Sequence, residues 1–213
     1  MKKINLTIVA LTALFTYSAN AQTSFVTSAD ADNNDTNTFD QAMQVEVDEL
    51  FILDVTDGLN NEVTNVKLDM GDVTQEAGTY DFASVVTDPM YLQYSSVVPS
   101  TGGTRTVDVG FVANSGNIPD NTELVIKFAN GIQDAGDQAG NIGTVAGANQ
   151  VVLEHNNNTA ETLINSIGSA VTGSTGVAGL EMTYELQEAA GFDFGNYTAQ
   201  TYNGTLRYTI SSI

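Results

Sequence analysis

The sequence predicts an all-β protein, specifically an antiparallel Ig-like β-sandwich of about 8–10 strands. Two observations support this class. Short apolar runs, many with period-2 alternation, recur through residues 42–213 and are separated by turn signals roughly every 8–15 residues. No segment sustains a 3.6-residue apolar period, and the best helix candidate, residues 160–167, spans barely two turns.

Residues 1–21 are typical of a cleavable bacterial export signal. Lys2 and Lys3 form a positive start, residues 8–15 are apolar, and small residues precede the expected cleavage after Ala21. The apolar stretch is far shorter than the roughly 20 residues that cross a bilayer. We therefore expect an exported chain without a transmembrane segment after cleavage. It is expected outside the cell or at the cell surface, with the periplasm as the alternative.

Residues 22–41 are rich in Ser, Thr, Asn and Asp and hold few large apolar residues. Such a stretch cannot bury enough apolar surface to offset the entropy lost on ordering, so it is predicted to be a flexible polar leader. The strand-like runs begin after it. Residues 42–213 are therefore predicted to form a single β-sandwich domain, a length that suits one domain.

The first predicted strand is residues 43–48, where apolar and polar residues alternate. Residues 50–55 follow as a more continuous apolar run, typical of a strand buried on both faces, and Asp57 and Gly58 give a turn signal. Residues 63–70 are the next predicted strand. The uneven spacing of their apolar residues indicates a bulge or a late start.

The later predicted strands are rich in β-branched and aromatic residues: 90–98, 104–112, 123–128, 150–153, 180–186 and 205–210. In the last of them Leu206, Tyr208 and Ile210 share one face and are expected to point into the core. Four basic residues outside the signal lie within predicted strands, and we expect all of them to point outward and to pair with acids: Lys67, Arg105, Lys127 and Arg207.

The chain is strongly acidic, with 6 Lys and Arg against 26 Asp and Glu. The signal holds two of the basic residues and no acid, so the mature chain would carry 4 basic and 26 acidic residues, a formal charge of −22. Coulomb repulsion then opposes binding to nucleic acid or to an anionic membrane. The absence of cysteine from the sequence excludes disulfides and thiol catalysis.

No catalytic set emerges from the residue pattern. The single histidine, His155, follows a predicted strand in a polar stretch, and with no second histidine or cysteine to join it we expect an exposed loop residue. No Gly-x-Ser-x-Gly motif is present, and no pair of carboxylates stands out. The sequence therefore predicts a non-enzymatic protein without a resident cofactor.

Calcium binding is the alternative to the prediction that the protein has no cofactor. Asp134, Asp137 and Asn141 lie in a Gly-rich loop and offer the oxygen ligands that calcium prefers. The same residue types are common in solvated turns, and three donors do not complete a site. Turn chemistry is therefore the preferred interpretation of this loop, and calcium binding is the second.

The segment from Gly195 to Ile210 resembles the closing strand of secreted bacterial β-sandwich modules. A Gly-x-Tyr element leads into Thr205-Leu206-Arg-Tyr208-Thr-Ile210, as in chaperone–usher-type fimbrial subunits, spore-coat-U-like proteins and WxL-like surface domains. The chain departs from these patterns because it contains neither a cysteine pair nor Trp-x-Leu. The resemblance implies a surface or extracellular β-sandwich that works in assembly or adhesion, and it brings no catalytic residue.

Together these observations favour a non-enzymatic, exported structural or adhesive surface protein, such as a subunit of a fimbria-like filament. Its expected partners are other subunits or further copies of itself. The alternative is a calcium-dependent carbohydrate- or ligand-binding β-sandwich module that is directed at surface polysaccharide.

Overall fold

The computed structural model describes residues 42–69, 82, 85–112, 118–133, 140–147, 149–173, 175–193, 195 and 199–211. The regular structure in these ranges is β-strand apart from the 3₁₀ residues Phe82 and Gly195, which confirms the predicted all-β class. The chain divides into two units, Met1–Val45 and Glu46–Ile213. Residues 42–45, which are the described part of the first unit, are extended and exposed. The predicted signal and leader lie outside the described residues. Within the described ranges no helix is long and apolar enough to cross a membrane.

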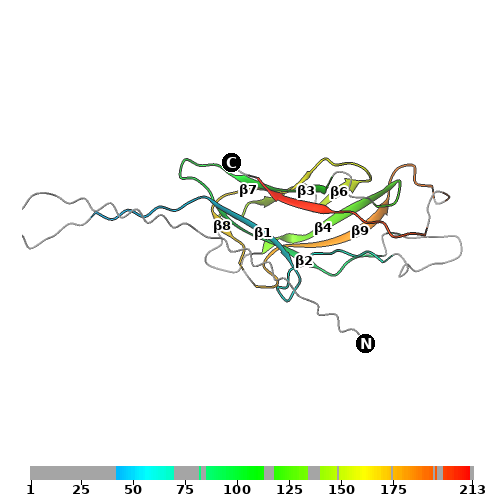
Figure 1. The fold of residues 1–213 in the computed structure, drawn as a ribbon, viewed down its shortest axis with the longest axis horizontal. Helices are drawn as coiled ribbons and strands as arrows, with labels where there is room; N and C mark the ends of the chain where they lie inside the picture. Colours follow the sequence, from blue (N-terminus) through cyan, green and yellow to red (C-terminus); the bar gives the residue numbers. More distant parts are fainter. Residues whose placement is uncertain are drawn as a thin grey trace, which may run out of the picture. The chain divides into compact units, whose positions relative to one another are not determined.

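The larger antiparallel sheet has the strand order β1-β2-β9-β4-β6, and β8 also pairs with β2 (Figure 1). Its strands are β1 (Leu50–Thr56), β2 (Met90–Val97), β4 (Thr122–Gln133), β6 (Gln150–Glu154), β8 (Ala170–Val171) and β9 (Gly179–Glu188). The smaller sheet has the order β10-β3-β7-β5. It contains β3 (Arg105–Phe111), β5 (Thr144–Val145), β7 (Glu161–Ile167) and β10 (Leu206–Ile210).

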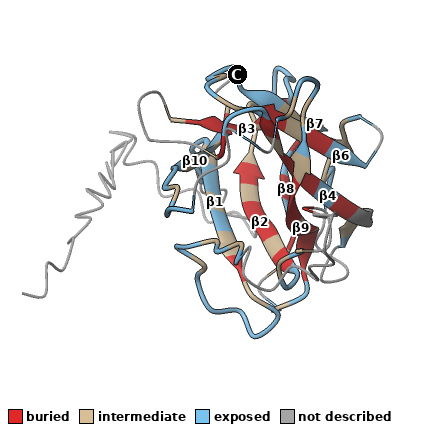
Figure 2. Ribbon diagram, turned by 90° about the vertical axis from the view of Figure 1, so that its right-hand side faces the viewer, coloured by how far each residue is buried: buried red, intermediate tan, exposed pale blue. Residues whose placement is uncertain are grey.

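Both sheets contribute to one hydrophobic core. Leu180, Met182 and Tyr184 of β9 alternate with more exposed residues and are fully buried, as are Val107 and Val109 of β3. Figure 2 shows buried residues along β2, β4 and β9, whereas β1 is largely exposed. The edge strands β1 and β10, one from each sheet, lie side by side at the same margin of the core (Figures 1 and 2).

Most predicted strands are confirmed, including those that became β1, β2, β3, β4, β6, β9 and β10. The expected burial of β1 on both faces is wrong, because β1 is an edge strand and Phe51 and Ile52 are 47% and 55% exposed. The predicted strand at residues 43–48 is wrong, because residues 42–49 form no strand. Met43, Val45 and Val47 are 85%, 71% and 76% exposed. Alternation makes a segment suitable for a sheet, but a strand forms only where a neighbouring strand supplies hydrogen-bond partners.

The predicted strand at residues 63–70 is wrong for residues 63–69, which form no strand, and residue 70 lies outside the described residues. Thr56 and Glu62 form an isolated bridge, and the Val63 amide donates to the Val55 carbonyl at 2.8 Å. The chain then leaves β1, and as far as residue 69 it has no ladder partner among the described residues. Its apolar side chains nevertheless pack against the core and are partly buried: Val63, Val66 and Leu68.

Residues 160–167, the helix candidate, form strand β7 instead. Leu163, Ile164 and Ile167 are fully buried, and their spacing imitates one face of a helix. The cause is an irregular register between β3 and β7, with shifts around Val107, and Ser166 has a positive φ of 60°. A β-bulge lets successive residues face the same side, so a bulged strand loses its period of two.

Arg105 does not point outward as predicted; it is fully buried. It is in phase with Val107 and Val109, because alternate residues of a strand face the same side. Its guanidinium donates to the Glu49 carboxylate at 2.8 Å and to the Ser211 carbonyl at 2.9 Å.

The other three basic residues, Lys67, Lys127 and Arg207, are exposed, although Lys67 lies outside any strand. Lys67 and Lys127 form the expected ion pairs with acids. Lys67 Nζ lies 2.6 Å from Asp69, and Lys127 Nζ lies 2.7 Å from the buried Glu185.

Candidate functional site

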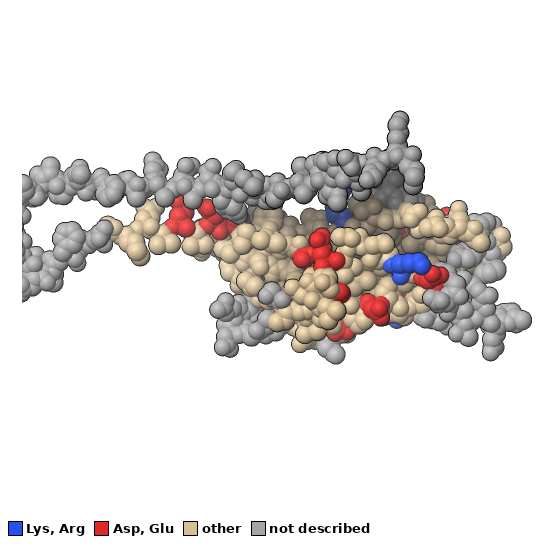
Figure 3. All heavy atoms as spheres, turned by 60° about the horizontal axis from the view of Figure 1, so that its bottom comes forward, with Lys and Arg blue, Asp and Glu red and all other residues tan. Residues whose placement is uncertain are grey.

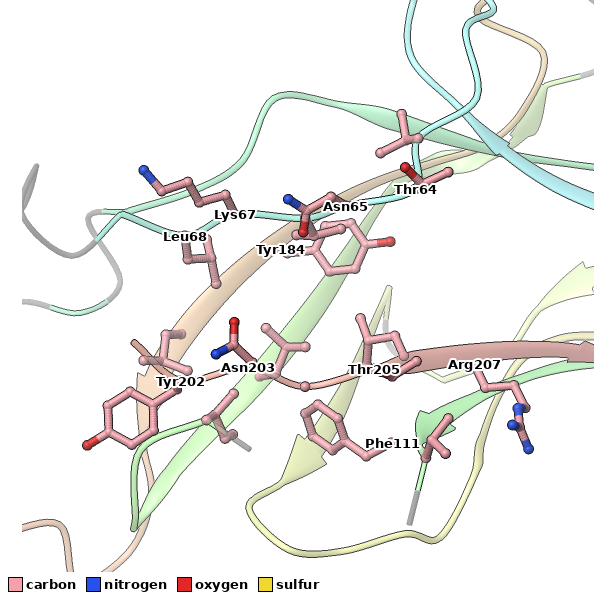
Figure 4. Close-up of a pocket in the computed structure, with 18 of the residues that line it drawn as sticks. Thr64, Asn65, Lys67, Leu68, Phe111, Tyr184, Tyr202, Asn203, Thr205 and Arg207 are labelled. Carbon is pink, nitrogen blue, oxygen red and sulfur yellow. The ribbon is translucent and has the colours of Figure 1, made fainter. Parts of the chain in front are cut away.

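The candidate site is a large groove between residues 62–69 and residues 199–208 (Figure 4). Its volume is about 1330 Å³. Pockets for small molecules usually enclose roughly 300–1,000 Å³. The groove therefore has room for a longer, extended occupant.

The first wall is formed by the chain after it leaves β1. A tight turn precedes it, in which the Asp57 carboxylate accepts hydrogen bonds from the Leu59 and Asn61 amides at 2.8 Å. The bonds from the Asn61 side chain and backbone hold the pKa of Asp57 below its ordinary value. Gln93 Nε2 donates to Asn60 Oδ1 at 3.2 Å and fastens the turn to β2. The turn thereby sets where the wall begins.

The second wall is formed by residues 199–205 and the start of β10. The Val112 amide donates to the Thr205 carbonyl at 2.9 Å, which extends the β3–β10 ladder by one step. Leu206 and Tyr208 of β10 are half-buried against the core, whereas Arg207 between them is exposed. Figure 4 shows Arg207 directed away from the opposite wall. The predicted inward phase of β10 is thus confirmed.

The floor of the groove is formed by core residues of both sheets: Phe111, Leu124, Tyr184 and Leu186. The hydroxyls of Tyr184 and Tyr208 lie 2.5 Å apart and join the two sheets across the core. Burial raises the pKa of Tyr184 to about 12 and raises that of Tyr208 well above its ordinary value. Both tyrosines are therefore neutral at physiological pH, and the floor is apolar with one hydrogen-bonded polar pair.

His155 anchors the loop at residues 118–120, which contributes to the lining of the groove. Its Nδ1 lies 2.7 Å from the Ile118 carbonyl oxygen, and its Nε2 lies 2.8 Å from the Asp120 carboxylate. Ile118 and Pro119 line the groove, so the histidine positions part of its boundary. The sequence predicted only an exposed loop residue, because nothing in the pattern links residue 155 to a loop more than thirty residues earlier.

The groove runs between two strand edges that carry no ladder partner along most of their length among the described residues. β1 pairs with β2 on one side, and the backbone contacts of its other side within the described ranges are at Val55 and Thr56. Among the described strands, β10 pairs with β3. Leu53, Asp54 and Val55 of β1 line the groove, as do Leu206, Arg207 and Tyr208 of β10. Such edges are templates for pairing with another extended chain.

Charge is unevenly distributed around the groove. Among the lining residues Asp54, Glu62 and Asp69 lie on the β1 side, where Lys67 pairs with Asp69 at 2.6 Å. Arg207 is the charged residue on the β10 side, and no described residue forms an ion pair with it. Figure 3 shows acidic side chains spread over one face of the molecule, with few basic ones among them. An exposed arginine in such a surface is an attachment point for an anionic group.

The predicted calcium ligands are only partly described. Asp134 and Asp137 lie outside the described residues. The Asn141 side chain accepts a hydrogen bond from the Gly143 amide at 3.3 Å, and its backbone bonds to Ser169 and Gly168. Asn141 therefore acts as a turn residue. Within the described ranges no three His, Asp or Glu side chains gather closely enough to hold a metal ion.

No family model, no curated protein and no solved structure matches this chain.

Proposed function

We propose that this protein is an exported, non-enzymatic structural or adhesive surface protein with an Ig-like sandwich fold. In this proposal it is a subunit that joins copies of itself into a fimbria-like filament. The observation that carries the proposal is the groove of about 1330 Å³ between two open strand edges. An extended polypeptide fits such a site, because main-chain hydrogen bonds to an open edge supply affinity and alternate side chains fill the groove.

The occupant we propose is the arm, residues 42–48, of a second copy. The arm is extended and exposed, and its apolar residues Met43, Val45 and Val47 alternate with Gln44, Glu46 and Asp48. A strand of this pattern presents one apolar face to a core and one polar face to solvent. The groove has a matching apolar floor and lacks such a strand among the described residues.

The free energy of association depends on backbone hydrogen bonds to a free strand edge as well as on apolar burial. Burial of three apolar side chains contributes about 4.5–9 kcal/mol, at roughly 1.5–3 kcal/mol each. Association of two molecules costs an estimated 4–15 kcal/mol of lost freedom, so apolar contacts alone leave little net affinity. Hydrogen bonds from the arm to the free edge of β10 or β1 would then decide whether the link between copies is stable.

The test uses the purified full chain and the change Val45→Asp with Val47→Asp. We expect the double variant to remain folded, because both side chains are exposed, and to lose filaments or oligomers in negative-stain microscopy and analytical ultracentrifugation. Val171→Asp with Val177→Asp is the matched control, since these side chains are 44% and 56% exposed and neither lines the groove. Unchanged association in the arm variant would contradict the proposal.

A carbohydrate-binding module is the second candidate, and the side chains of the walls favour it. Asn65, Asn203 and Tyr202 line the groove, and Figure 4 shows them on its two walls. Amides and a phenol of this kind hydrogen-bond sugar hydroxyls. Retention of the protein on immobilised polysaccharide, lost on addition of a chelator and unaffected by the arm variant, would favour this candidate over assembly.

A further inference from the structure

We infer that Arg207 selects the strand that enters the groove by pairing with Glu46 on the acidic face of the arm. This inference rests on the proposed function, because it concerns the same groove and the same occupant. It assigns Arg207 a role in specificity and fixes the register in which the arm lies against β10.

The position of Arg207 on the edge strand is the first argument. It is exposed and lies between Leu206 and Tyr208, whose side chains face the core. Its partner in the β3–β10 register is Gly110, and a Cβ at that position would lie 3.1 Å from the Ala160 Cα. No acidic side chain can therefore occupy the site directly opposite Arg207 on β3. The next residue of β3 on that face, Asp108, lies opposite Thr209 and accepts a hydrogen bond from Thr162 at 2.7 Å. The free edge of β10 beside Arg207 therefore offers a place for a further anionic partner.

The register of the arm is the second argument. If Glu46 lies opposite Arg207, Val45 and Val47 lie beside Leu206 and Tyr208, whether the arm runs parallel or antiparallel to β10. The apolar residues then share the inward face, and the acidic residue shares the outward face with the arginine. A shift by one residue would place the valines outward and Glu46 over the apolar floor. Pairing of charges and burial of the valines thus require the same register.

The distribution of charge is the third argument. Two copies with 26 acidic residues each repel one another, so an acidic arm meets like charge over most of a neighbour's surface. On the β1 side of the groove Asp54 and Glu62 also oppose an acidic face, whereas the charge of Asp69 is compensated by Lys67 at 2.6 Å. The β10 side presents Arg207, whose planar guanidinium binds a carboxylate through two hydrogen bonds. An arm whose acidic face lies along β10 therefore meets attraction, and one turned toward β1 meets repulsion.

The experiment is a charge-swap cycle in the full chain. Arg207→Glu and Glu46→Arg are each expected to weaken self-association about tenfold, measured by sedimentation equilibrium, because like charges then face each other. The doubly swapped chain has the net charge of the original protein and is expected to recover affinity to within about threefold. Glu188→Arg changes the net charge as Glu46→Arg does, at an exposed position outside the groove, and serves as the control.

The outcomes separate the two proposals. If the arm valines are required for association but neither charge reversal changes it, the groove is the docking site and the role of Arg207 is wrong. If both reversals weaken association and the double swap does not recover it, the residues act independently and the pairing is wrong. If the chain does not associate at all, or associates without the arm valines, the proposed function and this inference fail together.

Discussion

At the scale of single residues, Arg105 shows what a sequence pattern cannot reveal. The sequence predicts that Arg105 points outward, whereas in the structure it faces the core in phase with Val107. The structure buries it because three groups converge on the guanidinium: Glu49, the Ser211 carbonyl and the ring of Phe51, 4.7 Å away. These partners lie far apart in the sequence, so only the tertiary fold brings them together.

Loss of the Glu49 charge should destabilise the fold more than loss of an exposed partner. Glu49→Gln leaves Arg105 buried without a counter-charge, and we expect about 1–3 kcal/mol of destabilisation in urea unfolding. This is less than the roughly 3–5 kcal/mol for a wholly buried pair, because the Glu49 side chain is 49% exposed. Asp69→Asn, which breaks the exposed pair with Lys67, should cost below about 0.5 kcal/mol. Equal costs for the two variants would show that burial of Arg105 adds nothing.

The buried tyrosines predict a loss of stability in alkali. Burial raises the pKa of Tyr184 from 10 to about 12, so the unfolded chain releases this proton first as the pH rises. The contribution of Tyr184 to stability is complete below pH 10 and falls between pH 10 and pH 12. The loss is about 2–3 kcal/mol, since each pKa unit corresponds to about 1.4 kcal/mol. Urea unfolding from pH 8 to pH 12 tests this, and a Tyr184→Phe variant with an unchanged pH dependence would contradict it.

At the scale of elements, the sequence predicts strands well where apolar and polar residues alternate regularly and neighbouring strands supply hydrogen-bond partners. It fails where hydrogen-bond partners decide the outcome: residues 43–48 alternate but pair with no strand, and residues 63–69 pack against the core but leave the ladder. It also fails at β7, whose bulge removes the period of two. The walls of the groove come from such segments, so the candidate site was not predictable from local patterns.

Mutations can test which side chains of β10 face the core. Leu206 packs against the core, whereas Thr209 is exposed on the other face. Leu206→Ala should therefore cost about 2 kcal/mol, at the lower end of the usual range for Leu→Ala because Leu206 is only half-buried. Thr209→Ala should cost well under 1 kcal/mol. Chemical denaturation of both variants measures the difference, and the reverse order would mean that the strand faces the other way.

At the scale of the whole molecule, composition predicts the charge but not its arrangement. The excess of 26 acidic over 6 basic residues was evident, and it implies self-repulsion in the compact state. The structure adds that Lys67 and Arg207 line the groove. Salt therefore acts on two processes, because it screens the repulsion within one chain and also the repulsion between copies.

The response of thermal stability to ions separates general screening from a calcium site. Screening should raise the melting temperature gradually over tens to hundreds of millimolar NaCl, because the Debye length falls from about 30 Å at 0.01 M to about 10 Å at 0.1 M. A site that included Asp134 and Asp137 would instead saturate at roughly millimolar calcium or below, even in 0.15 M NaCl. Within the described ranges Asn141 is a turn residue, so we expect screening alone. A steep shift with sub-millimolar calcium that Asp137→Asn abolishes, with the NaCl response intact, would instead establish a metal-dependent module.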